Sequence, residues 1–298
     1  MRFLFSATVF GLTALVGGCG STSSPESEGE PQLGAVRQLA DAENVTLPLD
    51  AYLATPEQNA TIDTARDILV RDCMKRFGFD WQVQERPVTP QPGRRYGISN
   101  AADVARYGYH LAPERTGPEK PEVDSLAKPS ADEQMVARGA GQSSYNGLRI
   151  PEGGCLAEAD RALGFEVTVH VGGGNERKDL VLKLNAVVRQ GFEGDSRLAV
   201  VYVKWSACMH DRGYDYKNPW AANNDPAMRV ETASAKEIAT AQADLACRNQ
   251  HNVAGVSLAI ETAHQARVIE KNTDALRSEK QKLDERVKKA GDLVSGVR

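Results

Sequence analysis

Two short segments of the chain share one pattern, and this repeat limits the fold more than any other feature of the sequence. Residues 73–81 read CMKRFGFDW and residues 208–216 read CMHDRGYDY, so both fit C-M-x-x-x-G-[FY]-D-[WY]. Four of the nine positions are identical, and two more are aromatic in both copies. Chance is a poor explanation for such a match, so we expect one structural unit to occur twice.

The repeated pattern is typical of the end of a helix. Its glycine fits the position just after the helix, where the backbone turns left-handed and the lack of a Cβ is an advantage. The next residue, which is aromatic, then contacts the methionine of the last turn, as in a Schellman cap. The residues in these places are Met74, Gly78 and Phe79 in the first copy, and Met209, Gly213 and Tyr214 in the second.

The N-terminal residues have the composition of an export signal. Met1 and Arg2 provide positive charge, and the 14 residues from 3 to 16 form an uncharged, mostly apolar run. This run is too short to span a bilayer comfortably, but it fits the core of a signal peptide. It ends in VGGC (residues 16–19), which resembles the lipobox of bacterial lipoproteins. In that family a diacylglycerol is attached to the cysteine, and the chain is cut just before it.

The lipobox resemblance implies that residues 1–18 are removed and that Cys19 carries lipid. The mature chain is then anchored at the extracellular face of the cell membrane. Two acyl chains on one cysteine are the minimum for a durable anchor. The alternatives are an ordinary secreted protein in which Cys19 occurs by chance, and an uncleaved anchor.

The chain contains five cysteines. If Cys19 carries lipid, four remain, and an even number in an exported protein predicts disulfides. Each copy of the motif is followed by a later cysteine in a helix-like segment, so we expect the pairs Cys73–Cys155 and Cys208–Cys247. The alternatives are a crossed pairing that joins Cys73 to Cys208, and four reduced cysteines.

Helix signals dominate the rest of the chain. Helices are expected from Thr55 to near Gly78, from Asn100 to Tyr107, over residues 176–190, over residues 195–212, and from Ser234 to about Ala290. Residues 165–171 are β-rich and predict a short strand. Near the C-terminus, apolar residues recur every seven positions among charged neighbours, which predicts a narrow seam on a solvated helix. These residues are Ile269, Leu276, Leu283 and Ala290.

We therefore predict a mainly α fold, with two disulfide-tied helical units, a Pro-rich loop insertion and a long C-terminal helix. Eight of the fourteen prolines lie in residues 87–151, which marks the insertion, and residues 20–31 contain no aliphatic side chain, which marks a flexible tether. The expected parts are the signal peptide (1–18), the lipid anchor and tether (19–47), the first helical unit with its insertion (48–165), the second helical unit (166–250) and a protruding C-terminal helix (251–298).

A tyrosine-rich stretch between proline-rich flanks, residues 94–110, is the candidate binding surface. Its aromatic faces and its basic and imidazole donors suit a sugar ring or a protein partner. The candidate residues are Arg95, Tyr96, Tyr107, Tyr109 and His110. The alternative is that the tyrosines pack over the two helical units as a clasp.

The usual signs of catalysis and of metal or nucleotide binding are not found in the sequence. None of the five histidines lies in an H-E-x-x-H motif, and no serine lies in G-x-S-x-G. The glycine run at residues 172–174 lacks the Lys-Ser/Thr of a phosphate loop. The net charge is −4 with both signs interspersed, which is not the footprint of a nucleic-acid-binding protein. We therefore predict no catalytic residue, no metal and no cofactor.

Three further segments carry a resemblance to a group of uncharacterised lipoproteins predicted from actinobacterial genomes. They are RRYGISNAADVARYGYH (residues 94–110), WSACMHDRGYDY (205–216) and EIATAQADLACRNQ (237–250). Together with VGGC, the likeness covers most of the mature chain. It implies an exported, membrane-tethered protein and supplies no mechanism.

We therefore expect a non-catalytic envelope lipoprotein, held to the membrane by the lipid on Cys19, that docks a transport complex or the cell wall. Its partner is expected to be an envelope protein or a cell-wall glycan. The alternatives are a solute-binding lipoprotein of a transporter and a cell-wall hydrolase. High strand content would favour the first alternative over the docking protein, because solute-binding proteins of this kind alternate strands and helices.

Overall fold

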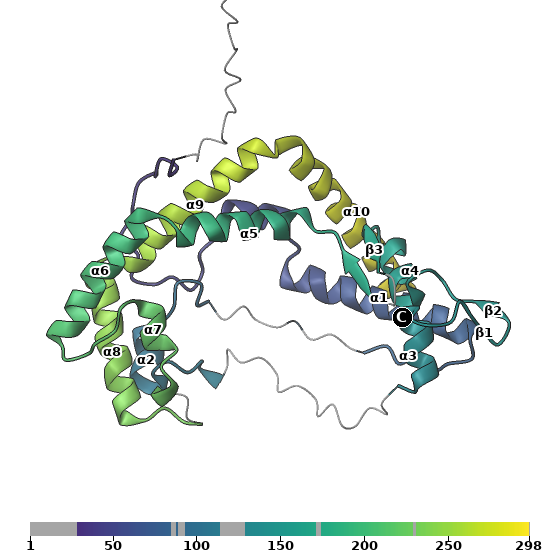
Figure 1. Cartoon of the computed structure of the whole chain (residues 1–298), viewed down its shortest axis with the longest axis horizontal. Helices are drawn as coiled ribbons and strands as arrows, with labels where there is room; N and C mark the ends of the chain where they lie inside the picture. Colours follow the sequence, from purple (N-terminus) through teal and green to yellow (C-terminus); the bar gives the residue numbers. More distant parts are fainter. Residues whose placement is uncertain are drawn as a thin grey trace, which may run out of the picture. The chain divides into compact units, whose positions relative to one another are not determined.

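Ten α-helices dominate the part of the chain that the computed structural model describes, which is residues 29–84, 88, 93–113, 129–170, 174–228 and 231–297 (Figure 1). The helices are α1 (Pro56–Arg76), α2 (Ala101–Tyr107), α3 (Ala131–Arg138), α4 (Gly154–Ala162), α5 (Leu180–Glu193), α6 (Ser196–Asp211), α7 (Pro219–Asn223), α8 (Ala235–Gln250), α9 (Val253–Lys271) and α10 (Thr273–Val297). Short 3-10 turns cover Pro48–Tyr52 (η1) and Pro226–Met228 (η4). The prediction of a mainly α fold with a long C-terminal helix is confirmed.

Several helices begin at the residues that the sequence indicates. The Thr55 hydroxyl accepts a hydrogen bond from the backbone N–H of Gln58, whose side chain in turn binds Thr55, which forms the expected capping box. Asn100 caps α2, and Asp195 caps α6. Each cap satisfies backbone N–H groups that have no partner within their helix.

Two short hairpins interrupt the helices. The strands β1 (Ser144–Tyr145) and β2 (Leu148–Arg149) pair with each other, as do β3 (Val167–Val169) and β4 (Asn175–Arg177). The expected strand within residues 165–171 is therefore present. The helix expected over residues 176–190 begins later, because Glu176 pairs with Thr168 in the second hairpin and Asp179 then caps α5.

Both copies of the repeated motif end a helix with the same hydrogen bonds. In the first copy, Gly78 has a φ of +83°, and the N–H of Phe79 donates to the carbonyl of Met74 at 3.2 Å. In the second, Gly213 has a φ of +86°, and the N–H of Tyr214 donates to the carbonyl of Met209 at 3.0 Å. These are the bonds of a Schellman cap, so the motif sets where α1 and α6 stop.

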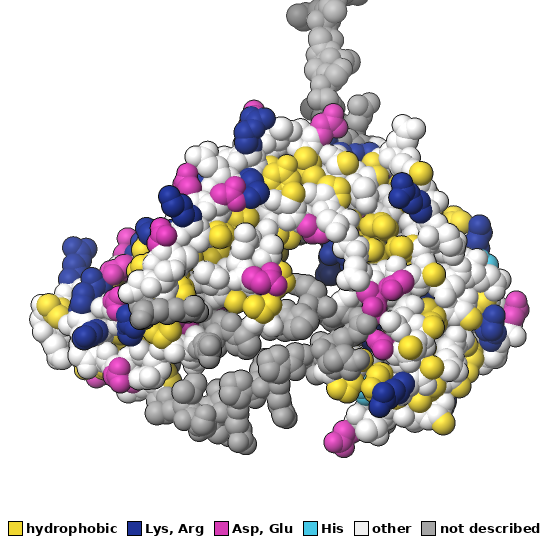
Figure 2. All heavy atoms as spheres, turned by 180° about the vertical axis from the view of Figure 1, so that it is seen from behind, with side chains coloured by type: hydrophobic (Ala, Val, Ile, Leu, Met, Phe, Trp, Pro, Cys, Tyr) yellow, Lys and Arg dark blue, Asp and Glu magenta, His cyan; other side chains and the backbone are white. Residues whose placement is uncertain are grey.

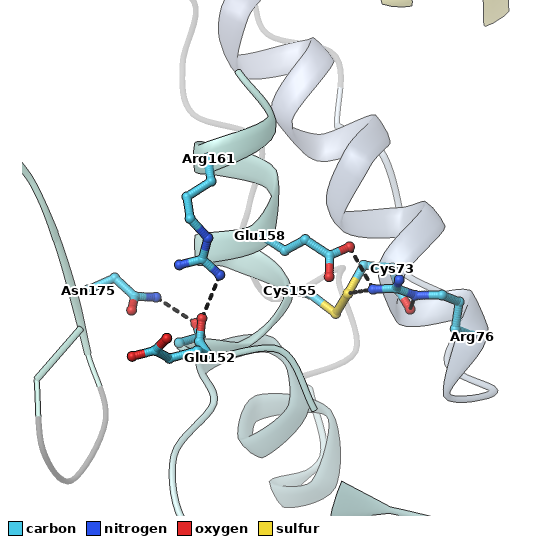
Figure 3. Close-up of a disulfide and its surroundings, with 8 residues drawn as sticks. Cys73, Arg76, Glu152, Cys155, Glu158, Arg161 and Asn175 are labelled. Atoms are coloured by element: carbon cyan, nitrogen blue, oxygen red, sulfur yellow. Dashed lines mark hydrogen bonds and ion pairs between the residues drawn. A yellow bond between two sulfur atoms is a disulfide. The ribbon is translucent and has the colours of Figure 1, made fainter. Parts of the chain in front are cut away.

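The disulfide Cys73–Cys155 joins the end of α1 to the beginning of α4 (Figure 3). In Figure 3, Arg76 reaches from α1 toward Glu158 of α4, and its guanidinium lies 2.6 Å from that carboxylate. Apolar side chains from α1, α3 and α4 close around the disulfide. The buried members are Val70, Cys73, Met74, Phe77, Val136, Ala137, Ile150, Cys155 and Ala159.

The second disulfide, Cys208–Cys247, joins the end of α6 to the end of α8. Its apolar surroundings come from α6, α7, α8 and α9. The buried members are Leu198, Val201, Trp205, Cys208, Met209, Ala222, Cys247, Val253 and Ile260. Both predicted disulfide pairs are confirmed, and the crossed pairing is excluded.

The C-terminal helix does not protrude. The seam residues Leu283 and Ala290 are buried against Ile62 and Ala65 of α1, and Leu276 is buried against Val268 of α9. The expected heptad seam is therefore real, but it is covered by other parts of the same chain. In Figure 1, α10 follows directly from α9, which in turn lies beside α5.

Residues 31–47 lie against the helices, which contradicts the prediction that they belong to a flexible tether. The carbonyl of Pro31 accepts a hydrogen bond from Arg197, and the N–H of Leu39 donates to Asn252 at 3.0 Å. Leu33 packs against the second disulfide cluster, and Leu47 is buried. Residues Pro31–Arg298 form one compact unit, separate from Met1–Glu30, so the predicted tether ends before Pro31. Cys19 and the predicted signal peptide lie outside the described residues.

Candidate docking surface

The tyrosine-rich stretch lies against α8 and α9, and its five candidate residues differ in exposure. Tyr96 is 5% exposed, whereas the side chain of Arg95 is 44% exposed. Tyr107, Tyr109 and His110 are partly buried. The stretch therefore offers solvent only part of the surface expected from the sequence.

Arg95 and Tyr96 both bind the carboxylate of Glu261 on α9. The Arg95 guanidinium donates to both carboxylate oxygens, and the Tyr96 hydroxyl donates to Oε2 at 2.8 Å. The hydrogen bond to Glu261 raises the pKa of Arg95. Burial, reinforced by the charge of Glu261, raises the pKa of Tyr96 well above its usual range. Arg95 therefore stays charged and Tyr96 stays neutral at ordinary pH.

Tyr109 joins a buried polar network centred on Asp244 of α8. The Tyr109 hydroxyl donates to Asp244 at 3.1 Å, and the indole N–H of Trp205 donates to the same carboxylate at 2.8 Å. Arg248 donates to Asp244 at 2.7 Å and to the carbonyl of Tyr96 at 2.7 Å. Burial and the charge of Asp244 raise the pKa of Tyr109. These contacts tie the tyrosine stretch to α6 and α8, which is the arrangement of a clasp.

His110 lies beside a second buried carboxylate of α8. Its Nε2 is 3.5 Å from Oε2 of Glu237, whose side chain is 0% exposed. The other oxygen of Glu237 accepts from the backbone N–H of Tyr109 at 3.0 Å. The carbonyl groups of Tyr109 and His110 accept from the Arg94 guanidinium at 2.6 and 2.7 Å. The backbone of this segment is therefore held in place, and the exposed parts of Arg95, Tyr107 and His110 remain available to a partner.

Another histidine–carboxylate pair lies between the start of α6 and α9. Nε2 of His264 is 3.1 Å from Asp195, and the other edge of the imidazole packs against Gly191 of α5. Burial acts to raise the pKa of Asp195, but hydrogen bonds from Arg197 and His264 outweigh it and hold the pKa below its usual value. Because Asp195 also caps α6, this pair joins three helices structurally.

Two classes of site are not found in the described part of the chain. Those residues contain no cluster of three or more His, Cys, Asp or Glu side chains that could hold a metal ion. None of their helices combines the length and the hydropathy that a membrane crossing requires.

The most exposed apolar side chains lie on α5 and α6, outside the binding surface predicted from the sequence. On α6, Val203 is 69% exposed and Val200 is 55% exposed. On α5, the corresponding values are 67% for Leu182 and 57% for Val187. The opposite face of α6 carries the buried residues Leu198, Val201, Trp205, Cys208 and Met209. A helix that is apolar on all sides is normally buried, so the open face of α6 is a candidate docking surface.

A groove of about 490 Å³ borders this face of α6. Its apolar lining comes from α6, from the N-terminal segment (residues 31–47) and from the beginning of α9. Its polar lining includes three cationic or imidazole side chains. The lining residues are Leu33, Val36, Arg197, Val200, Val201, Lys204, Gln250, His251, Asn252 and Val256. The groove therefore combines apolar walls with a basic edge, at the place where the chain enters the compact unit.

No protein-family model, curated protein or solved structure matches the chain.

A smaller cavity of about 210 Å³ lies among η1, α1 and α10. Arg177 and Arg286 sit on the ring of Phe165, 4.1 and 3.7 Å from its centroid. Glu279 and Asp179 also line the cavity. Both signs of charge are therefore present, but the volume is below the roughly 300–1,000 Å³ of typical ligand sites.

Charges on the surface are mixed rather than segregated. In Figure 2, Lys and Arg side chains are interspersed with Asp and Glu side chains over the visible face, and hydrophobic patches lie between them. This agrees with the small net charge of −4 and differs from the continuous basic stripe of a nucleic-acid-binding surface.

Proposed function

We propose that the protein is an exported, non-catalytic lipoprotein that is held by lipid on Cys19 at the extracellular face of the cell membrane. The observation that carries this proposal is the use of the five cysteines. Four of them form the two disulfides, and the fifth is the cysteine of the VGGC sequence. Disulfides of this kind persist in oxidising compartments, which supports export.

The proposed role of the anchored protein is to dock a component of the envelope, either an envelope protein or a cell-wall glycan. The exposed side chains of Leu182 and Val187 on α5 support docking, because exposed apolar side chains on folded proteins commonly mark interaction sites. The rigid backbone of the tyrosine stretch supports a second, polar contact through Arg95, Tyr107 and His110.

The lipid anchor is tested by expressing the full chain and its Cys19→Ala variant in a bacterium with a single membrane, in medium that contains a labelled palmitate analogue. We expect label on the wild-type chain and none on the variant. We also expect protease added to intact cells to degrade the wild-type chain. An unlabelled wild-type chain, or one protected from external protease, would contradict the proposal.

A solute-binding lipoprotein is the second candidate, and the charged cavity beside Phe165 is the observation that favours it. The described chain has only two short hairpins and no alternation of strands with helices, which is unlike the fold expected for such a protein. A thermal-shift screen of small zwitterions on the wild type and on Arg286→Ala tests this candidate. If the protein binds such a solute, a zwitterion should raise the melting temperature of the wild type but not that of the variant.

A further inference from the structure

We propose that the exposed face of α6 is a second membrane contact, which rests on the lipid surface beside the anchor and orients the folded unit. The contact surface consists of Val200 and Val203 on α6, Leu33 and Val36 in the N-terminal segment, and Trp220 on α7. This inference builds on the proposed lipid anchor at Cys19. It adds the lipid bilayer as the partner of this particular face.

The length of chain between the anchor and the compact unit supports this occupant. Cys19 and Pro31 are separated by twelve residue steps. Whatever conformation those residues adopt, covalent geometry limits their span to about 40 Å. The carbonyl of Pro31 is held by Arg197 of α6 at 2.9 Å, so the chain enters the compact unit directly beside the proposed contact surface. A lipid on Cys19 therefore keeps the start of α6 within reach of the bilayer, at most about 40 Å away.

The shape of the surface also fits a bilayer. At about 100° per residue, Val200 lies about 60° to one side of Val203, and Tyr202 lies about 100° to the other. The groove with Leu33 and Val36 adjoins the Val200 side. On the other side, the indole N–H of Trp220 donates to the Tyr202 hydroxyl at 3.2 Å, and Trp220 is 38% exposed. An apolar centre edged by Trp and Tyr is typical of a surface that lies in the membrane interface.

The charges around the groove favour anionic headgroups. Lys204 and His251 line it, and its lining contains no Asp or Glu among the described residues. Arg197 also lines the groove, but its charge is balanced by the hydrogen-bonded carboxylate of Asp195. Lys204 is exposed on the same helix face as Val200 and Val203, where it can reach a headgroup while the valines contact acyl chains.

A weak contact is sufficient in this arrangement. A short tether raises the effective concentration of the surface at the bilayer to the order of millimolar. The α6 face therefore need not bind vesicles tightly by itself. The contact favours one orientation of the anchored unit. In that orientation, Arg95 and His110 have a defined position relative to the membrane.

The experiment couples residues 19–298 through the Cys19 thiol to a maleimide phospholipid in vesicles. This route needs no cellular lipidation, so failure of the lipoprotein proposal in cells and failure of the membrane contact give separate results. Omitting residues 1–18 is justified because Pro31–Arg298 forms its own compact unit. The other four cysteines are in disulfides and do not react.

Quenching of tryptophan fluorescence by lipids with brominated acyl chains is the readout. We expect quenching of the coupled wild type, loss of most of that quenching in Trp220→Phe, and its loss in the Val200→Asp/Val203→Asp variant. The matched control is Leu182→Asp/Val187→Asp on α5, where the original side chains are equally exposed but lie on another helix. The control should quench like the wild type. Removing anionic lipid from the vesicles should reduce the quenching by at least half.

Three results would overturn the membrane contact. The first is a coupled wild type that is quenched no more than its Val200→Asp/Val203→Asp variant. The second is equal loss of quenching in the α5 control. The third is a dimer of the wild type in vesicle-free solution that the α6 variant abolishes, which would assign this face to a second copy of the chain. Near-ultraviolet circular dichroism verifies that each variant is folded, and the single Val203→Asp variant replaces the double one if it is not.

Discussion

The two copies of the C-M-x-x-x-G motif build the same helix end in different surroundings. In both copies the glycine has a positive φ, and the aromatic N–H binds the methionine carbonyl five residues earlier. The disulfides, however, run in different directions. Cys73 at the end of α1 meets the beginning of α4, whereas Cys208 at the end of α6 meets the end of α8. The motif therefore specifies a helix end and a cysteine position, but not the neighbour.

The cores around the two disulfides also differ in polarity. The first disulfide lies among apolar side chains, and Arg76, which donates to Cys73 Sγ at 2.9 Å, is 52% exposed. Near the second, Trp205 binds the buried carboxylate of Asp244, which also holds Arg248 and Tyr109. A buried polar network fixes orientation because each member needs its partners. The second copy is therefore the one built to hold the clasp and the N-terminal segment in a defined arrangement.

Removing each disulfide should have the largest effect on stability. The pairs Cys73→Ala/Cys155→Ala and Cys208→Ala/Cys247→Ala open loops with sequence separations of 82 and 39. In the chain-entropy model the losses are about 4.5 and 3.9 kcal/mol, so the first pair should cost slightly more. Urea denaturation of both variants measures the difference. A clearly larger loss for the second pair would show that its polar surroundings depend on the crosslink.

Removing one buried carboxylate from α8 and one from α4 should have the next largest effect. We expect the two variants to lose different amounts of stability. Asp244→Ala leaves the charge of Arg248, which is 4% exposed, without its carboxylate partner, so we expect a loss of about 3–5 kcal/mol. The matched variant is Asp160→Ala in α4. Its partners Arg66 and Arg177 are 23% and 34% exposed and can turn to water, so the loss should be about 1–2 kcal/mol. Equal losses in the two variants would contradict the proposed difference between the cores.

The cap glycines should behave alike in both copies. Gly78→Ala and Gly213→Ala place a Cβ where no atom lies within 4 Å, so the cost is the left-handed backbone alone, about 1–2 kcal/mol. Gly194, which follows α5 with a φ of −88°, is the control, and its replacement by Ala should cost nothing or stabilise. Chemical denaturation gives all three values, and a marked difference between Gly78 and Gly213 would disprove the equivalence of the two caps.

Acid should lower the stability of the fold through two carboxylates, one in α4 and one at the cap of α6. Burial acts to raise the pKa of Asp160, but the hydrogen bonds from Arg66 and Arg177 outweigh it and lower the pKa. The pKa of Asp195 is lowered by Arg197 and His264 against the effect of burial. A carboxylate whose pKa is lower in the folded state contributes all of its stabilisation at pH values above the unfolded-state pKa of about 4. This stabilisation is lost as the pH falls through the folded-state pKa.

The melting temperature should therefore fall below about pH 4 in the wild type. The decline should be shallower in Asp160→Asn and in Asp195→Asn, because each variant has lost one of the titrating groups. A variant whose decline is as steep as that of the wild type would show that its carboxylate does not contribute.

Local features of the fold could be predicted, because their causes lie within a few residues. The capping box of Thr55, the caps at Asn100 and Asp195, and the two glycine helix ends depend on backbone bonds between near neighbours. The disulfide pairs followed from the repeat, because each motif is followed by one further cysteine in a helix-like segment.

Non-local features could not be predicted. The seven-residue seam of α10 indicates an apolar face, but only the structure shows that α1 and α9 cover it. Residues 31–47 have a composition that suits a tether, yet Asn252 and Arg197 bind their backbone. The open face of α6 could have been suspected from its sequence, because apolar residues occur on both of its sides. Which side packs inward is decided by Trp205 and its distant partner Asp244.

The lipid on Cys19 determines where the folded unit is held, and the mass of the N-terminal peptide reveals whether that lipid is present. The chain is purified from membranes of an expressing bacterium, digested and analysed by mass spectrometry. We expect a first peptide that begins at Cys19 and carries at least two acyl chains. A first peptide that begins at Met1, or one that begins after Cys19 without lipid, would contradict it.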